Sequence, residues 1–176
     1  MPPKHSLEVG SWELGVKADR IHFMYSSALW LHSLLRWAVL FTGFVAWFRA
    51  IGGYTARRSL TPKDDLWGML LTISVDAQML IGLILYLFLS PITKIGIRNL
   101  AAAMRIDTAR FFTVEHLAGM IIGIALVHIG RVKIRKTTDA SRKHRLAMIF
   151  FGVALVVIII SIPWPGMPVA RPLLRP

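Results

Sequence analysis

The chain has 176 residues, of which 55% are hydrophobic, and its mean hydropathy is +0.59. The polar residues are too few to cover so much apolar surface, so the composition excludes an ordinary soluble domain and indicates a membrane protein. The net charge of +12 is concentrated in the segments between apolar stretches, which favours contact with anionic lipid over nucleic acid. The absence of cysteine excludes disulfides, thiolate metal sites and covalently attached c-type haem.

Residues 1–22 precede the first apolar stretch and carry six charged side chains, among them Lys4, Glu8 and Arg20. They lack the apolar region and the small-residue cleavage site of a signal peptide. We expect an extramembrane N-terminal extension here.

Four apolar stretches follow, each near the length of about 20 residues that a helix needs to cross a bilayer. Only helices satisfy all backbone groups at membrane depth within one segment. The sequence therefore predicts an all-α, integral membrane four-helix bundle over residues 23–162, with up-down-up-down topology. The predicted spans are 23–48, 66–90, 111–130 and 146–162.

Prolines mark the ends of two predicted spans. Ser90-Pro91 ends the second, because proline cannot continue the hydrogen-bond ladder, and a short surface helix is expected near 97–106. Residues 163–176 form a Pro-rich tail that we expect to be extended, either packed against a neighbouring protein or flexible, with Trp164 as an interfacial anchor.

The third loop sets the expected orientation. Residues 131–145 hold seven basic side chains, and such clusters lie on the cytoplasmic side. We therefore expect a multi-pass protein of a bacterial inner membrane with both termini outside.

Two histidines lie near the same end of the first and third spans. His32 is about nine residues into the first span and His116 about five into the third, and these two spans run parallel. At ~1.5 Å per residue the two histidines are within roughly 6 Å of the same depth. Paired imidazoles at matched depth can ligate a haem b iron from both sides, so we predict a bis-histidine haem with His32 and His116 as its metal ligands. The alternative is that both are hydrogen-bonded core residues.

Three glycines share the faces of these histidines. Gly43 lies nearly on the His32 stripe, and Gly119 and Gly123 lie close to that of His116. They could make room for a porphyrin, but Gly119-x-x-x-Gly123 is equally the small-residue pattern of close helix packing.

Arg36 lies one turn beyond His32 and needs an anionic partner at membrane depth. The candidates are a haem propionate, Glu115 and Asp76, which is at a similar depth in the second span. Gln78 points away from Asp76, so one of these two could face a partner subunit or a quinone rather than the bundle core.

Two further histidines, His128 and His144, lie toward the opposite end of the predicted bundle. A second haem between them is conceivable, although we favour an interfacial position for His128.

Four segments together resemble one family. "LHSLLRW", "DAQMLIGLILYLFLSP", "RFFTVEH" and "IFFGVALVVIIISIPWP" are similar to small four-helix bacterial membrane proteins labelled cytochrome b-like, over about residues 25–165. His32 and His116 occupy the positions of that family's His-x-x-x-Arg-Trp and Glu-His motifs. The resemblance implies binding of haem b and electron transfer.

Two functions follow as hypotheses. The first is a membrane-bound b-type cytochrome that exchanges electrons with a quinol or a redox partner on the outer face. The second is an accessory subunit of a larger respiratory or photosynthetic complex, either cofactor-free or binding a pigment magnesium through its histidines. Nothing in the sequence indicates hydrolysis or group transfer, so a stand-alone enzyme is not expected.

Overall fold

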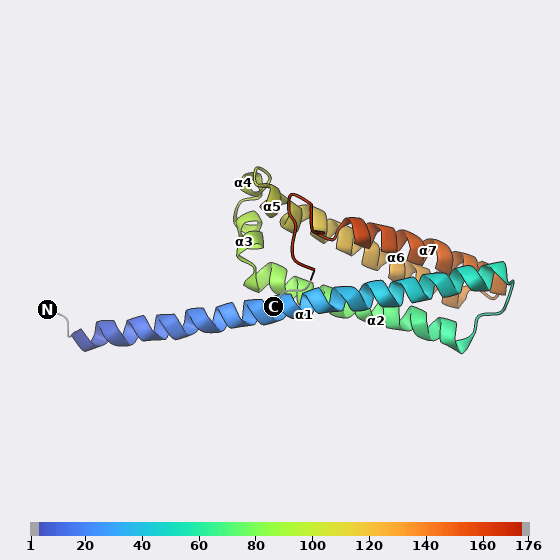
Figure 1. The fold of residues 1–176 in the computed structure, drawn as a ribbon, viewed down its shortest axis with the longest axis horizontal. Helices are drawn as coiled ribbons and strands as arrows, with labels where there is room; N and C mark the ends of the chain where they lie inside the picture. The colour runs from blue at the N-terminus through green and yellow to red at the C-terminus, as the bar shows by residue number, and fades with distance from the viewer. Residues whose placement is uncertain (1–3, 174–176) are drawn as a thin grey trace.

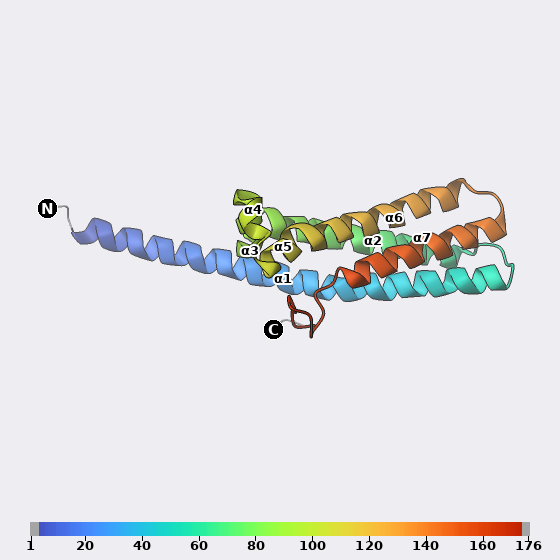
Figure 2. The ribbon, with the colours of Figure 1, turned by 90° about the horizontal axis from the view of Figure 1, so that it is seen from above.

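The computed structural model describes the backbone of residues 4–173 and the side chains of residues 16–173. Over this part of the chain the fold is all-α, without a strand, and four long helices form one bundle. Successive long helices run in opposite directions (Figures 1 and 2), which confirms the all-α bundle. The long helices are α1 (Lys4–Thr55), α2 (Pro62–Ile84), α6 (His116–Lys136) and α7 (Ala140–Ile160).

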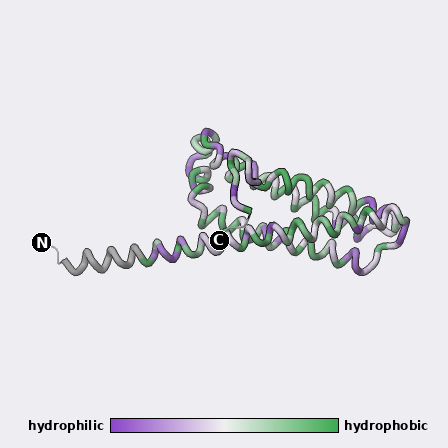
Figure 3. The backbone as a smooth tube through the Cα atoms, viewed as in Figure 1, coloured by the Kyte–Doolittle hydropathy of each residue, from purple (hydrophilic) through white to green (hydrophobic). Residues whose placement is uncertain are grey.

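Each of the four predicted spans corresponds to a helical segment long and apolar enough to cross a membrane. Large hydrophobic side chains cover the outer surface of the bundle, as expected where lipid replaces water. Hydrophilic stretches gather at the bundle's two ends and on the coloured part of α1 that lies ahead of the bundle (Figure 3). The segments are Val16–Thr55, Pro62–Leu89, Asp107–Lys136 and Ala140–Ile160.

The predicted N-terminal extension is not separate from the first span. From Lys4 onward it is part of α1, whose 52 residues make a helix about 78 Å long. The N-terminal part of α1 projects well past the other helices (Figure 1). The tips of the predicted extension and tail, residues 1–3 and 174–176, lie outside the described residues.

The two ends of the bundle differ in the segments that connect or follow the long helices. We call the end with the short connections 56–61 and 137–139 the loop end, and the end with the short helices and residues 163–173 the tail end (Figure 1). At the loop end, Thr61 and Asp64 form a capping box: Asp64 N–H donates to Thr61 Oγ1 at 3.3 Å, and Thr61 N–H donates to Asp64 Oδ2 at 2.8 Å. Arg49 binds the same carboxylate at 2.9 Å, which fixes α2 to the end of α1.

At the tail end, two turns of π-helix flank the bundle, η1 (Leu85–Leu89) and η2 (Phe111–Glu115). Between them lie α3 (Pro91–Arg98), α4 (Leu100–Ala103) and α5 (Asp107–Arg110). The expected short helix at 97–106 is split at Asn99, whose side chain caps α4 by accepting from Ala102 N–H at 3.0 Å.

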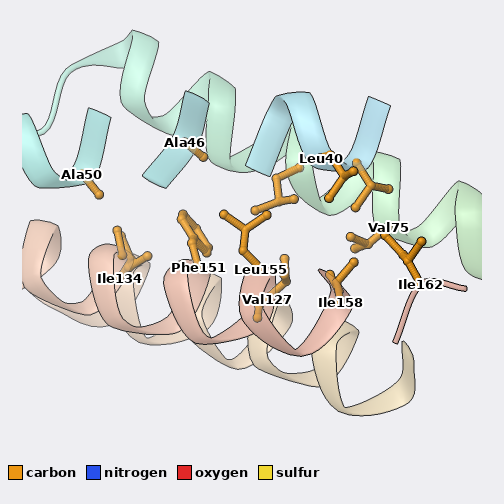
Figure 4. Close-up of a cluster of buried hydrophobic side chains, with 14 residues drawn as sticks. Leu40, Ala46, Ala50, Val75, Val127, Ile134, Phe151, Leu155, Ile158 and Ile162 are labelled. Carbon is orange, nitrogen blue, oxygen red and sulfur yellow. The ribbon is translucent and has the colours of Figure 1, made fainter. Parts of the chain in front are cut away.

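The hydrophobic core runs along the centre of the four long helices (Figure 4). Leu40 and Ala46 come from α1, Val75 from α2, Val127 from α6 and Phe151 from α7, and all are almost fully buried. This packing fixes the register between helices, and so determines which polar side chains meet at the tail end.

The tail does not extend away from the protein. Residues 163–173 fold back onto the bundle, with Arg36 donating to the Leu173 carbonyl and the Trp37 indole donating to it at 3.4 Å. The Trp164 ring packs edge-on against Trp37, with ring centres 6.4 Å apart. The described part of the tail therefore packs on its own bundle instead of extending away from it.

Candidate functional site

The two predicted ligand histidines meet inside the tail end of the bundle. His32 of α1 and His116, the first residue of α6, have ring centres 6.2 Å apart and ring planes inclined by 69°. Both line one cavity. The depth matching expected from parallel spans therefore brings the two rings together.

His116 is oriented by a carbonyl that two prolines leave available. A helical Ser161 carbonyl would normally accept from residue 165, and an Ile159 carbonyl from residue 163, but both of those residues are prolines without an N–H. His116 Nδ1 lies 2.8 Å from the Ser161 oxygen, and the Trp164 indole donates to the Ile159 oxygen at 2.8 Å. With Nδ1–H donating to a carbonyl, Nε2 of His116 keeps its lone pair for a ligand.

His32 has a different neighbour. Its Nε2 lies 3.1 Å from Nε2 of Gln78 in α2, and its buried Nδ1 has no hydrogen-bond partner among the described residues. Gly82 allows the ring to lie against α2, because a Cβ there would be 3.1 Å from Cε1 of His32. To ligate a metal through Nε2, His32 has to exchange its contact with Gln78 for the metal.

The cavity that both rings line is mostly apolar, and its polar contributors include both histidines, Gln78 and two arginines. Its volume is about 150 Å³. That is enough for a small aromatic molecule, but below the roughly 300–1,000 Å³ of pockets for larger ligands. A macrocycle therefore needs the open side of the cavity as well as its interior. The arginines are Arg36 of α1 and Arg171 of the tail, whose guanidinium lies 5.1 Å from the centre of the Phe112 ring.

The two rings make an edge-on contact, and the same spacing can be compared with that of two imidazoles on one metal ion. Two imidazoles bound to opposite sides of one metal ion, each through a bond of about 2 Å, have ring centres about 6 Å apart. The observed 6.2 Å agrees with that separation. Among the described side chains no cluster holds three or more His, Cys, Asp or Glu residues in position to bind a metal. A two-histidine site suits a metal whose other ligands come from a macrocycle.

The three glycines expected to make room for a macrocycle are elsewhere. None lines the cavity. A Cβ on each would meet α7 or the residue that follows it: Leu155 at 2.7 Å for Gly43, Ser161 for Gly119 and Ile158 at 2.7 Å for Gly123. This corrects our expectation, because these glycines allow α1 and α6 to approach α7 closely, the packing role that we had weighed for Gly119 and Gly123.

Arg36 lines the cavity, but neither acidic residue considered for it is its partner. Glu115 binds Arg110, with Oε1 2.8 Å from Nε, and Asp76 binds His128. Asp76, one of the three candidate partners, does not pair with Arg36 because it lies on the outer surface of the bundle. Arg36 instead contacts the tail through the Leu173 carbonyl.

His128 and His144 do not form a second site. His128 is on the outer surface, 46% exposed, with Nε2 2.8 Å from Asp76 Oδ1. His144 is fully buried, and its ring lies against Gly53 of α1. The two rings have different surroundings, and no cofactor between them is supported.

Four site residues were not singled out as ligands or supports from the sequence: Gln78, Gly82, Ser161 and Arg171. The available signal for Ser161 was Pro165, which has no N–H to donate to the Ser161 carbonyl four residues before it. For Gln78 the signal was an amide in the middle of an apolar span, although its direction depends on a partner helix that the sequence alone does not place.

Comparisons of this chain with protein-family models, with curated proteins and with solved structures found no match.

Proposed function

We propose that this multi-pass membrane protein is a b-type cytochrome, in which a haem b is held between His32 and His116 for electron transfer. The observation that supports this most is the 6.2 Å separation of two imidazoles from different spans, both of which line one cavity. A bound haem supplies one-electron exchange at its iron. The resemblance to cytochrome b-like proteins agrees with the proposal.

Each part of the site has a role in holding that group. The Ser161 carbonyl accepts from Nδ1 of His116 and so fixes the orientation of the ring. Binding of the haem would then cost little rotational freedom of this side chain. Arg36 and Arg171 place two cations at the cavity, where they suit the two carboxylates of a haem. The apolar walls, which include Leu117, Met120 and Ile124, exclude water from the iron.

The experiment is a reduced-minus-oxidised visible spectrum of the full chain, purified in detergent from cells supplied with haem. We expect the sharp bands of a six-coordinate, bis-imidazole haem b at about one haem per chain. His116→Ala and His32→Ala should each abolish this spectrum, because a single remaining imidazole leaves one axial position without a protein ligand.

The matched control is His128→Ala, which removes a histidine of the same helix outside the cavity and should retain the spectrum. A folded, colourless wild type from haem-replete cells would overturn the proposal. So would a spectrum that survives both His32→Ala and His116→Ala.

The orientation belongs to the same proposal. With the basic loop end at the cytoplasmic side of a bacterial inner membrane, the cavity lies in the outer half of the bilayer, and the redox partner acts from the outer face.

A second candidate, an accessory subunit of a larger membrane complex, is favoured by one observation. The N-terminal part of α1 projects beyond the bundle (Figure 1), and its described side chains from Val16 to Met24 are all exposed, Phe23 by 72%. Such a surface suits a neighbouring protein. Mild-detergent purification tests it: a stoichiometric assembly that is lost when residues 2–24 are deleted would favour this role, and a monomer in both cases would exclude it.

A further inference from the structure

A hydrogen-bonded acid–base pair lies on the outer surface of the bundle, away from the histidine cavity. Asp76 of α2 and His128 of α6 are joined by a 2.8 Å contact between Oδ1 and Nε2, and their side chains are 52% and 46% exposed. Asp76 lies midway along the apolar segment Pro62–Leu89. Asp76 therefore faces outward within the apolar length of α2, and His128, which we had expected at the membrane interface, meets it there.

The surroundings of the pair are apolar. Ile73 and Leu80 are one turn before and after Asp76 on the same face of α2, and they are 54% and 61% exposed. On α6, Val132 is one turn after His128 and Ile121 is two turns before it, and they are 51% and 48% exposed. The acid–base pair is thus a polar spot on a lipid-facing surface that spans two helices.

Ionisable side chains within spans are costly and as a rule mark functional sites. A ligand for this pair has to arrive sideways through the bilayer, so it must dissolve in lipid and also carry polar atoms that can bond a carboxylate or an imidazole. A hydroquinone meets both conditions: its hydroxyl donates to the carboxylate, and its ring and apolar tail lie on the flanking Ile and Leu side chains.

We propose that Asp76 and His128 form a binding site for the ring of a lipid-soluble quinone or hydroquinone at the α2–α6 surface. His128 holds the Asp76 carboxylate in place through Oδ1, and Oδ2 accepts from the ligand hydroxyl. This site is separate from the cavity of His32 and His116. It goes beyond the proposed function and does not depend on a bound haem.

The test uses the full chain in nanodiscs of phosphatidylcholine and phosphatidylglycerol with a photoreactive azidoquinone as the probe. After illumination, mass spectrometry locates the label. We expect labelling of α2 and α6 around residues 73–80 and 121–132. Excess decylubiquinone should prevent it, and decylbenzene, which has a similar tail but no oxygen atoms, should not.

Substitutions then test the pair itself. Asp76→Asn and His128→Gln should each lower labelling about tenfold, the effect expected from one lost charge-assisted hydrogen bond. Ile73→Ala is the matched control, since it changes an exposed neighbour on the same face of α2 and should leave labelling within about twofold. Thermal unfolding of each variant verifies that it is folded.

Labelling elsewhere on the chain, or labelling that both substitutions leave unchanged, would overturn the proposal. So would a stoichiometric partner whose transmembrane segment cross-links to position 76, because a protein helix would then cover this surface. The haem spectrum is recorded on the same samples, so a colourless protein that still takes the label refutes only the proposed function.

Discussion

Gly52 and Gly53 are neighbours in α1, but only one of them has space for a side chain. A Cβ at Gly53 would lie 2.2 Å from Cε1 of His144, which is fully buried, whereas a Cβ at Gly52 would meet nothing within 4 Å. Gly53 therefore allows α1 and α7 to approach each other at the loop end. Neither nitrogen of the buried His144 ring has a hydrogen-bond partner among the described residues, so this ring is held by packing.

This difference gives a prediction at the level of single residues. Gly53→Ala should lower the free energy of unfolding by about 1–3 kcal/mol, because a rigid ring and a helix backbone must move apart to fit a methyl group. Gly52→Ala should instead raise it by about 0.5–1 kcal/mol, because alanine restricts the unfolded chain more than glycine does. Denaturation of both variants in the same detergent measures the difference, and equal effects would show that the α1–α7 contact is looser than described.

At the scale of elements, the start of α2 depends on a local hydrogen-bond pattern that can be removed alone. Thr61→Ala should destabilise the protein by about 1 kcal/mol, because the first turn of α2 loses the oxygen that accepts from Asp64 N–H. Ser59→Ala is the control: Ser59 is exposed in the same loop, and its loss should cost less than about 0.5 kcal/mol. Thermal unfolding compares the two, and an equal loss from both would contradict the capping role.

The elements also show how far sequence reasoning extends. The four spans follow directly from runs of apolar residues, because a bilayer requires such runs. The turn at Ser90-Pro91 was predictable for the same kind of reason, since proline cannot donate to the ladder. The π-turns at 85–89 and 111–115 were not, because one extra residue per turn leaves no mark in hydrophobic periodicity.

The candidate site was predicted in part. Matched depth brought His32 and His116 together, because depth depends only on the count of residues along each span. Gly43 does not make room for a macrocycle and Asp76 does not pair with Arg36. Both predictions needed the direction in which a helix face points, and that depends on which neighbour the helix packs against. A helical wheel gives relative angles within one helix and does not say which angle points to α7 and which to lipid.

At the scale of the whole molecule, the basic loops predict an orientation that the cysteine-free chain makes simple to test. Ser59→Cys and Thr138→Cys, at the loop end, should resist a membrane-impermeant maleimide in intact cells and react after lysis, because basic loops remain on the cytoplasmic side. Met104→Cys, exposed at the tail end, should react in intact cells. The opposite pattern of labelling would invert the assigned orientation.

The length of α1 has a mechanical consequence. The helix is continuous from its projecting N-terminal part through the turn that carries His32 and Arg36, without a break in its backbone ladder. A continuous α-helix transmits a displacement of one end along its hydrogen-bonded backbone. A protein that binds the projecting part of α1 and tilts it would therefore shift the His32 imidazole relative to His116. Binding at the projecting part of α1 could in this way change the distance between the two rings.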